Sequence, residues 1–456
     1  MATLGVPAGG ELEQSIRRAL KGGAKSAAEL LEALGVSQPT LSRTIREMSR
    51  EVTSFRIKGV RTPQYGLLRQ LPLGLNPRQR IYKILSTGSF EPFAELEFLS
   101  GGATLERMGT AARLYEGLPP YISFAAPSGF LGRVQAQAAS ATAQFPESLK
   151  DWDDEHKLAY LFTRAVNQVG NLVFGDAAVE REMNLRKAHA RLGGDKAEHY
   201  EAVAMALKGH ALGSSAGGEQ PKFLATLEDV EHLIVKFAKL GTRMADLLPL
   251  EHLALRSLAE VGIPSSKTSL VSSGDFVFLE IRRFDRIGET GRVGMLSAGA
   301  VDDEFFGKRD TWSEFAARCE QVRYLSSKDV LQVDVMAAFS ELIGNTDRHF
   351  ENISLLIDER GEYIGIAPAY DILPMRYAPI GAGIDPDLVP IEPKVGTVGA
   401  KPQVWAMAAK AARRFWMAVQ TEQLPVPISD DMRMLAAKNL DVAISFVAPL
   451  LPAGAS

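Results

Sequence analysis

Hydrophobic residues near the start of the chain recur at the spacing of three short helices. In the first helix they lie four residues apart, at Leu12, Ile16 and Leu20. Ser26 and Glu29 form the capping box of a second helix, and Ser37 caps a third. Two serine-capped helices joined by a glycine-containing turn are typical of a helix-turn-helix.

A strand pattern follows these helices. Residues 54–68 alternate between apolar and polar side chains, with a turn at Lys58 and Gly59, and predict a two-stranded wing. Residues 1–72 are therefore expected to form a winged helix-turn-helix domain. A linker containing proline, at residues 71–77, is expected to separate this domain from the rest of the chain.

Beyond the linker, strand patterns come before helix patterns. Short segments broken by glycine and proline, at 117–122 and 127–133, predict turns and strand edges. The predicted strands are 223–227 and 232–237, with a hairpin over 269–279, and the predicted helices are 248–261, 312–322 and 327–343. This order predicts an α+β protein with two lobes. Residues 73–281 would hold the N-terminal region and the strands of the N-lobe, and residues 282–456 a mostly helical C-lobe.

Composition narrows the class of protein. The 456 residues, 46% of them hydrophobic, are enough for two or three domains with buried cores. The single cysteine, Cys319, excludes an internal disulfide framework and a Cys-based zinc site, and favours a reducing compartment. No apolar run reaches about eighteen residues, and the N-terminus lacks the apolar core of a secretory signal. We therefore expect a cytoplasmic protein without a membrane partner.

Charge is uneven along the chain. Residues 1–70 contain 11 Lys or Arg against 6 Asp or Glu, a net charge of +5, and the rest contains 40 against 49, a net charge of −9. The outer face of the third predicted helix carries side chains suited to base edges and phosphates: Gln38, Thr40, Ser42, Arg43 and Arg46. The predicted wing adds Arg56, Lys58 and Arg61. We expect residues 1–70 to bind double-stranded DNA; the alternative is a module that binds another protein.

The segment 344–352 holds an aspartate and an asparagine five residues apart, Asp347 and Asn352, and Asp371 follows nineteen residues later. Phosphotransferases with a protein-kinase fold use this order. One Asp accepts the proton of the substrate hydroxyl, and an Asn and a second Asp hold magnesium. Because an Asp and an Asn at this spacing are common in surface loops, the assignment depends on residues upstream.

Two upstream features suit the same chemistry. Residues 213–222 are rich in glycine and serine, and such a backbone can approach phosphates closely. Lys236 lies within the predicted strand 232–237, where a buried lysine is costly unless it is paired or bound to an anion. The helix predicted at 248–261 offers Glu251 as the partner. The alternatives are an ordinary turn at 213–222 and a strand-edge lysine that reaches solvent.

Together and in this order, these segments resemble the HipA family of bacterial serine/threonine kinases, the toxin half of a toxin–antitoxin system. The resemblance spans about residues 75–440. It rests on the motifs Ser-Ser-Ala-Gly-Gly-Glu-Gln-Pro-Lys, Ile-Val-Lys-Phe, Arg-Phe-Asp-Arg, Gly-Asn-Thr-Asp-Arg-His-Phe-Glu-Asn and Tyr-Asp-Ile. It implies a two-lobed protein-kinase-like fold, ATP and Mg²⁺ as cofactors, and a protein as the phosphate acceptor. The fused N-terminal domain, which the archetype lacks, resembles the single-chain, YjjJ-like branch of the family.

The resemblance also assigns roles at matching positions. Asp347 would be the catalytic base, Asn352 and Asp371 the magnesium ligands, and Lys236 the phosphate-contacting lysine with Glu251 as its partner. The expected ATP-binding residues are Ala216, Gly217, Gly218, Glu219, Gln220 and Lys222 at the phosphates, Arg282, Arg283 and Phe284 at the adenine, and His349 beside the nucleotide. Ser214 matches the serine whose autophosphorylation switches such kinases off, and its neighbour Ser215 is the alternative phosphosite.

The resemblance also bears on the substrate and the partners. In the archetype the target is glutamyl-tRNA synthetase, so an aminoacyl-tRNA synthetase or another translation factor is the expected substrate. A separate antitoxin is neither implied nor excluded, and the fused domain suggests autoregulation. Arg282 stands where the archetype has a glutamate, and the phosphate loop is one residue longer. The main alternative is a DNA-binding transcriptional regulator whose kinase fold only senses nucleotide, and a small-molecule kinase is a further one.

Overall fold

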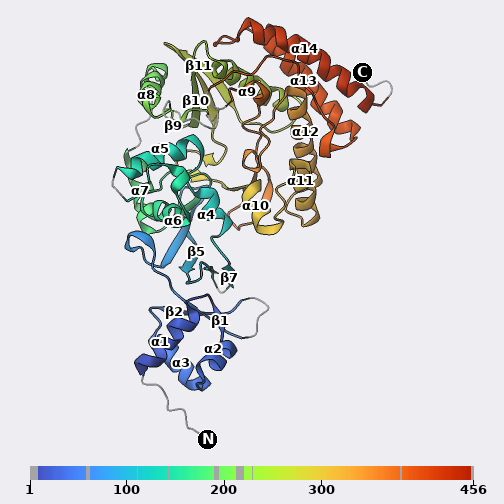
Figure 1. Cartoon of the computed structure of the whole chain (residues 1–456). Helices are drawn as coiled ribbons and strands as arrows, with labels where there is room; N and C mark the ends of the chain where they lie inside the picture. Colours follow the sequence, from blue (N-terminus) through green and yellow to red (C-terminus); the bar gives the residue numbers. More distant parts are fainter. Residues whose placement is uncertain are drawn as a thin grey trace.

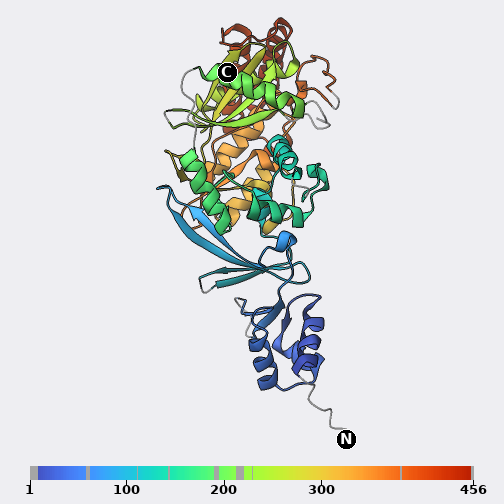
Figure 2. The same cartoon turned by 90° about the vertical axis from the view of Figure 1, so that its left-hand side faces the viewer.

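The computed structural model describes residues 9–57, 62–109, 111–141, 144–188, 195–211, 220–228, 230–380 and 383–452. These residues form an elongated molecule (Figures 1 and 2). The N-terminal helices lie at one end, and helices α13 (Pro402–Thr421) and α14 (Asp430–Val447) lie at the other. Among the described helices, none combines the length and the apolar character needed to cross a membrane.

The N-terminal unit consists of three helices packed on a small antiparallel sheet with the order β1-β3-β2. Its elements are α1 (Gly9–Leu20), β1 (Lys25–Ser26), α2 (Ala27–Leu34), α3 (Gln38–Glu47), β2 (Val52–Phe55) and β3 (Gln64–Leu67). Ser26 and Glu29 form the capping box of α2, and the Ser37 side chain caps α3. The predicted turn at Lys58 and Gly59 lies outside the described residues, and so does the DNA contact expected of Lys58.

A charged network joins the N-terminal unit to the sheet that follows it. The buried carboxylate of Glu97 accepts hydrogen bonds from Thr53 of β2 (2.7 Å), Arg78 (3.0 Å) and Arg107 (3.1 Å). Arg78 also donates to the carbonyl oxygen of Ser49 (2.9 Å), and Arg107 to that of Ser54 (3.0 Å). Because a buried carboxylate without these donors would be costly, the network holds the two units in one relative position.

The middle unit is a five-stranded antiparallel sheet with the order β7-β6-β5-β4-β8 and four helices. Its strands are β4 (Arg78–Ile84), β5 (Phe90–Phe98), β6 (Thr104–Met108), β7 (Ala111–Tyr115) and β8 (Leu172–Phe174). Its helices are α4 (Pro120–Ala125), α5 (Gly129–Ser140), α6 (Asp154–Thr163) and α7 (Asp176–Ala188). Short loops lie at 117–119 and 127–128, but the strand edges predicted within 117–122 and 127–133 were wrong, because Pro120 and Gly129 begin helices there.

The N-lobe is a four-stranded antiparallel sheet with the order β11-β12-β10-β9, covered by α8 on one face and α9 on the other (Figure 1). Its elements are α8 (Lys196–Ala211), β9 (Lys222–Thr226), β10 (His232–Lys239), α9 (Arg243–Ala259), β11 (Thr268–Ser273) and β12 (Phe276–Arg282). Helix α9 begins five residues before the predicted helix at 248–261, where the Thr242 side chain caps its first turn.

The C-lobe is largely helical and has the largest hydrophobic core among the described residues. Its helices are α10 (Ala298–Phe305), α11 (Trp312–Gln321), α12 (Ser327–Ile343), α13 and α14. Trp405 and Trp416 of α13 are fully buried in this core. Its strands are β13 (Arg286–Ile287), β14 (Gly291–Arg292), β15 (Gly294–Ser297), β16 (Ser354–Ile357) and β17 (Tyr363–Ile366). Strands β15, β16 and β17 form a small sheet in that order.

Candidate functional site

Lys236 lies on the face of the N-lobe sheet that helix α9 covers. Side chains alternate along a strand. Val235 and Phe237 of β10 therefore pack on the α8 side, and Ala238 packs with Leu248 of α9. Lys236 shares the side of Ala238, so its ammonium group reaches α9.

The Lys236 ammonium group is held between two carboxylates. Its Nζ donates to the Glu251 oxygens at 2.9 and 2.7 Å and to Oδ1 of Asp371 at 2.6 Å. The Lys236 and Glu251 side chains are 4% and 0% exposed. Although burial disfavours the charged ammonium, Asp371 and Glu251 raise the pKa of Lys236. Burial raises the pKa of Glu251, in opposition to the charge of Lys236.

Asp371 lies on a strained turn after β17. Its φ angle is +55°, a left-handed conformation that non-glycine residues adopt mainly where the surrounding structure imposes it. Its side chain is 33% exposed, and its Oδ2 makes no hydrogen bond to a residue that the structure describes. Burial alone would raise the pKa of Asp371, but the charges of Lys236 and Lys222 outweigh it and lower this pKa to about 2. Asp371 is therefore an ionised carboxylate with one oxygen available to a ligand.

Asp347 is placed by the end of helix α12. Gly344 ends that helix in the left-handed conformation, with a φ of +75°. Asn345 is buried, and its Oδ1 accepts a hydrogen bond from the backbone N–H of Asp347 (3.1 Å). This local turn fixes the backbone of Asp347, whose side chain is 46% exposed. An exposed carboxylate on a fixed backbone is suited to accept a proton from a bound hydroxyl group.

Asn352 closes the same loop. It ends a 3₁₀ turn (Phe350–Asn352), and its buried side-chain amide donates to the carbonyl oxygen of Asp347 (3.0 Å). Its Oδ1 accepts no hydrogen bond from the described residues. The Tyr370 hydroxyl group bonds Ser354 (2.7 Å) and the carbonyl oxygen of Glu351 (2.8 Å), so the loop lies beside the segment that carries Asp371. The structure thus brings Asp347, Asn352, Asp371, Lys236 and Glu251 into one region.

His349 is close enough to Asp347 and Asp371 for both negative charges to affect its pKa. Its Nδ1 is 3.3 Å from Oε2 of Glu351, and its Nε2 is 3.7 Å from Oδ2 of Asp347. The hydrogen bond with Glu351 raises the pKa of His349, and the charges of Asp347 and Asp371 act in the same direction. The hydrogen bond with His349, followed by that with Arg309, lowers the pKa of Glu351 to about 2. A protonated His349 beside Asp347 would favour an anionic ligand.

We expect NMR titration to separate His349 from His252. His349 should titrate above the ordinary value of about 6.5, and His252 below it, because burial and then Arg256 lower the pKa of His252. The stabilisation by the His349–Glu351 pair should be complete between about pH 4.5 and 6.5. It is lost as the pH rises through the raised pKa of His349, and also as the pH falls toward the lowered pKa of Glu351.

The variant Glu351→Gln should return His349 toward its ordinary pKa and leave that of His252 unchanged. Histidine ring signals of the isotope-labelled full chain would measure both. An unchanged titration of His349 in this variant would contradict the role given to Glu351.

The segment expected to contact adenine has mixed surroundings. Arg283 is buried, and its guanidinium group binds Asp285 (2.9 and 2.8 Å) rather than pointing into an open site. Arg282 is exposed and pairs with Glu231 (3.0 Å). The Phe284 ring lies 5.7 Å from the Tyr370 ring. The Arg283 side chain therefore holds this segment in position, and the adenine contact expected here would have to come from the Phe284 ring or the backbone.

The phosphate loop is described only at its end. The predicted residues Ala216, Gly217, Gly218 and Glu219 lie outside the described residues, as do the predicted phosphosite Ser214 and its alternative Ser215. Gln220 is buried, and its Nε2 donates no hydrogen bond to a described residue. Lys222 of β9 lies directly opposite Lys236 of β10 in the sheet, so two cationic side chains come from neighbouring strands.

Comparisons with known proteins identify the family. Residues 75–183 match the middle domain of YjjJ-like toxins, and residues 214–430 match the HipA-like C-terminal domain. The protein called Toxin YjjJ of Escherichia coli (strain K12) is 33% identical over 410 residues, which cover 87% of this chain and 90% of that protein. The chain belongs to the YjjJ-like toxin family.

Two solved structures resemble parts of this YjjJ-like chain. HipA of Shewanella oneidensis MR-1, in a complex with HipB and operator DNA, is 14% identical with a TM-score of 0.48, and the match covers 80% of this chain and 97% of HipA. The proinflammatory kinase CtkA of Helicobacter pylori is 12% identical with a TM-score of 0.36, over 49% of this chain and 90% of CtkA.

The donor set of the YjjJ-like site suits a magnesium ion that is shared with phosphates. Among the described residues no group of three or more His, Cys, Asp or Glu side chains could hold a metal by itself. Asn352 and Asp371 offer one amide oxygen and one carboxylate oxygen. Mg²⁺ is commonly held by one or two carboxylates together with substrate phosphates and water. These residues therefore fit a nucleotide-bound ion better than a permanent metal centre.

Sequence reasoning missed several residues that hold this site. Asn345 fixes the backbone of Asp347, and Tyr370 joins the two halves of the site. Arg309 binds Glu351 (2.5 Å) and Asp303 (2.6 Å). The Asn at position 345, just after a helix-ending glycine, was a visible signal of an Asx turn. The contacts of Tyr370 and Arg309 depend on distant segments and gave no local signal.

The predicted DNA-binding face lies on helix α3. Gln38, Arg43 and Arg46 are exposed, and Thr40 and Ser42 are half-buried. A cavity of about 390 Å³ beside this helix is lined by Ser42, Arg46 and, from the middle sheet, Arg78. Arg78 of the middle sheet therefore adds a basic side chain beside helix α3. This contribution was not predicted from the sequence.

Proposed function

We propose that the protein transfers the γ-phosphate of ATP to serine or threonine hydroxyl groups of a protein, as a HipA-type toxin kinase. The observation that carries this proposal is the position of Lys236 between Glu251 and Asp371, next to the loop that joins Asp347 to Asn352. Phosphoryl transfer depends mainly on positioning and on neutralisation of charge. In this proposal the buried cation Lys236 and the ionised carboxylate of Asp371 neutralise and position the phosphates. The exposed carboxylate of Asp347, held on a fixed turn, accepts the proton.

Each group has a distinct task in this proposal. Lys236 and Lys222 contact the phosphates, and the N–H donors of Gln220 offer a phosphate oxygen a hydrogen bond that the described residues do not satisfy. Asn352 and Asp371 hold Mg²⁺, which neutralises phosphate charge when it is bound. Asp347 accepts the proton of the acceptor hydroxyl. A cavity of about 510 Å³ next to Asp347, lined also by Trp312 and Thr397, leaves room for the acceptor segment.

The expected substrate is a protein of the translation machinery, such as an aminoacyl-tRNA synthetase. The HipA structure contains HipB and operator DNA, so an antitoxin-type partner is a related proposal for this chain. The alternative function is that of a transcriptional regulator that binds nucleotide without transferring phosphate. An intact set of Lys236, Asp347, Asn352 and Asp371 favours the kinase, because nucleotide sensing alone does not require a proton acceptor.

Incubation with ATP and Mg²⁺, followed by peptide mass spectrometry, tests the activity. We expect one phosphate on the segment that contains Ser214 and Ser215, with Ser214 as the site, because autophosphorylation there is proposed as the off-switch. Ser214→Ala should remove this phosphate, and Ser215→Ala should keep it. ATP binding without phosphate on any residue of the chain or on translation proteins would favour the sensor instead.

We also propose that residues 1–70 bind double-stranded DNA and regulate the gene of this protein. Arg43→Ala should weaken binding to upstream promoter DNA about tenfold, because Arg43 is exposed on the face of α3. The control Arg18→Ala removes the same charge from an exposed position of α1 that is not among the predicted DNA contacts, and it should have a smaller effect. Fluorescence anisotropy over a range of salt concentrations measures both. Equal effects would indicate attraction by net charge alone, and no binding at low salt would indicate a protein-interaction module.

A further inference from the structure

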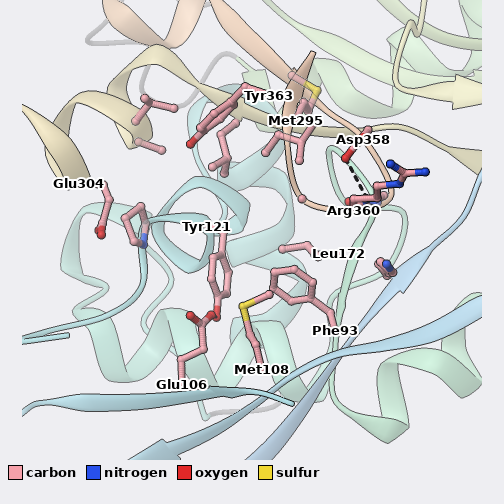
Figure 3. A pocket seen from close by; sticks show the side chains of 18 of the residues that line it. Phe93, Glu106, Met108, Tyr121, Leu172, Met295, Glu304, Asp358, Arg360 and Tyr363 are labelled. Atoms are coloured by element: carbon pink, nitrogen blue, oxygen red, sulfur yellow. Dashed lines mark hydrogen bonds between the residues drawn. The ribbon is translucent and has the colours of Figure 1, made fainter. Parts of the chain in front are cut away.

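A cavity of about 310 Å³ lies between the middle sheet and the C-lobe (Figure 3). Its walls come from β4 to β7 and α4 on one side, and from β15, α10 and the turn between β16 and β17 on the other. It thus lies between the segment that matches the YjjJ-like middle domain and the segment that matches the HipA-like domain. None of the residues given a role in phosphoryl transfer lines it.

Much of the wall is apolar or aromatic. Phe93, Met108, Tyr121, Leu172 and Met295 surround the space in Figure 3. The Phe93 and Tyr121 rings meet edge to face at 5.8 Å. A cavity with such walls and a few polar groups is the usual form of a site for a small organic molecule.

The carboxylate of Glu106 lies at this wall without a cationic partner. Glu106 is 5% exposed, and its oxygens accept hydrogen bonds from the hydroxyl groups of Tyr121 (2.5 Å) and Tyr115 (3.2 Å). Within the described part of the chain, no Lys, Arg or His nitrogen lies within 4.0 Å of it. Two neutral donors satisfy its hydrogen bonding but leave its charge uncompensated in a buried place.

Three cationic residues line the cavity: Arg113 and Lys83 are engaged elsewhere, and Arg360 is an exposed residue of the turn between β16 and β17. Arg113 is directly opposite Glu106 in the β6–β7 pairing, yet its guanidinium group pairs with Glu304 and lies over the Tyr115 ring at 4.7 Å. Lys83, another cation of the wall, donates to the carbonyl oxygen of Glu359 (2.5 Å). The carboxylate of Glu304 is therefore paired, whereas that of Glu106 is left facing the cavity.

Asn171 supplies a second polar group. It is 8% exposed, lines the cavity, and its side-chain amide makes no hydrogen bond to a residue that the structure describes. A buried amide normally has partners, so a ligand with a second polar group could satisfy it. Glu106 and Asn171 come from separate segments, on β6 and just before β8.

We propose that this cavity binds a small organic amine, with an aromatic or branched apolar body packed among Phe93, Met108 and Met295 and an ammonium group paired with Glu106. A charge-assisted hydrogen bond in a site screened from water adds more affinity than the same contact made by a neutral hydroxyl group. The site is separate from the phosphoryl-transfer groups, so this proposal stands whether or not the protein is a kinase.

The test uses the full chain and three matched probe pairs in isothermal titration calorimetry. The amines are 2-phenylethylamine, tryptamine and isoamylamine, and each is compared with the alcohol that carries a hydroxyl group in place of the amine. We expect at least one amine to bind about tenfold or more tightly than its alcohol. Its binding should also raise the melting temperature, and the shift should keep growing with the logarithm of the free amine concentration above the dissociation constant.

One test variant and two control variants complete the experiment. Glu106→Gln should reduce amine binding to the level of the alcohol. Glu95→Gln, which removes an exposed charge paired with Arg80 on the same sheet, should leave it unchanged. Asp347→Asn should also leave it unchanged, because Asp347 does not line the cavity. Equal affinity of each amine and its alcohol, absence of binding by all three amines, or full amine binding to Glu106→Gln would each overturn the proposal. The comparison of amine with alcohol on the unaltered chain holds even if Glu106→Gln does not fold.

Discussion

Replacing Asp347 by asparagine is expected to slow phosphoryl transfer by about 10²–10⁴-fold, the usual loss when a general base is removed. Asparagine keeps the size of the side chain but cannot accept the proton of the acceptor hydroxyl. The Asp347 side chain is half-exposed, and Asn345 holds its backbone rather than its carboxylate. We therefore expect the fold and the affinity for ATP to change little.

Single-turnover phosphorylation of the Ser214 segment measures this rate, and calorimetry measures ATP binding. The control Asp385→Asn removes an exposed carboxylate of the C-lobe that makes no hydrogen bond to the described residues, and it should keep the full rate. A normal rate in Asp347→Asn would exclude Asp347 as the base. A loss of ATP binding in the same variant would mean that Asp347 acts on the nucleotide instead.

Replacing Lys236 by methionine should have the largest effect on stability. The change leaves Glu251 fully buried, next to Asp371, without the cation that both carboxylates share. Breaking a buried ion pair by removing one partner typically costs about 3–5 kcal/mol. The double variant Lys236→Met with Glu251→Gln should recover most of that loss, because the fully buried charge is gone and the remaining carboxylate, Asp371, is 33% exposed. ATP binding should be lost in both variants, because both lack the proposed phosphate contact of Lys236.

The loss in Lys236→Met should also depend on pH. Burial already raises the pKa of Glu251 above its ordinary value of 4.5, and removal of Lys236 would raise it further. The folded variant therefore gains stability when Glu251 is protonated, and its deficit should grow as the pH rises above about 4.5. Hydrogen exchange of the α9 amides reports the local free energy of opening. A deficit independent of pH, or no recovery in the double variant, would contradict this explanation.

Local features of the sequence predicted much of the architecture. The capping box of Ser26 and Glu29, the cap at Ser37 and the end of α12 at Gly344 depend only on neighbouring residues. The apolar and polar side chains around Lys236 alternate with the two-residue period of a strand, which can be read without knowledge of distant contacts. Such features could be found without knowledge of the fold.

Other features depend on contacts between distant segments, and the sequence did not indicate them. Arg283 was expected at the adenine, but its guanidinium group is buried against Asp285 and a carbonyl oxygen of the middle unit, at Gln168. The network around Glu97 joins residues from three parts of the chain. Helix α4 begins at Pro120. In a sequence, a proline can mark either the end of a strand or the first turn of a helix. Here the helix packs against α6 and β15, which are contacts that the local sequence does not reveal.

The network around Glu97 would also fix the direction in which the rest of the chain extends from DNA bound through α3. Since Arg78 and Arg107 fix the N-terminal unit on the middle sheet, the N-lobe and C-lobe of such a DNA-bound chain would project from the double helix in one direction. Two copies on neighbouring half-sites would have active sites whose separation follows the operator. Each added base pair would move one copy by ~3.4 Å along the axis and turn it by about a tenth of a revolution around it. The spacing of the operator would thus decide whether one copy can reach the phosphate loop of the other.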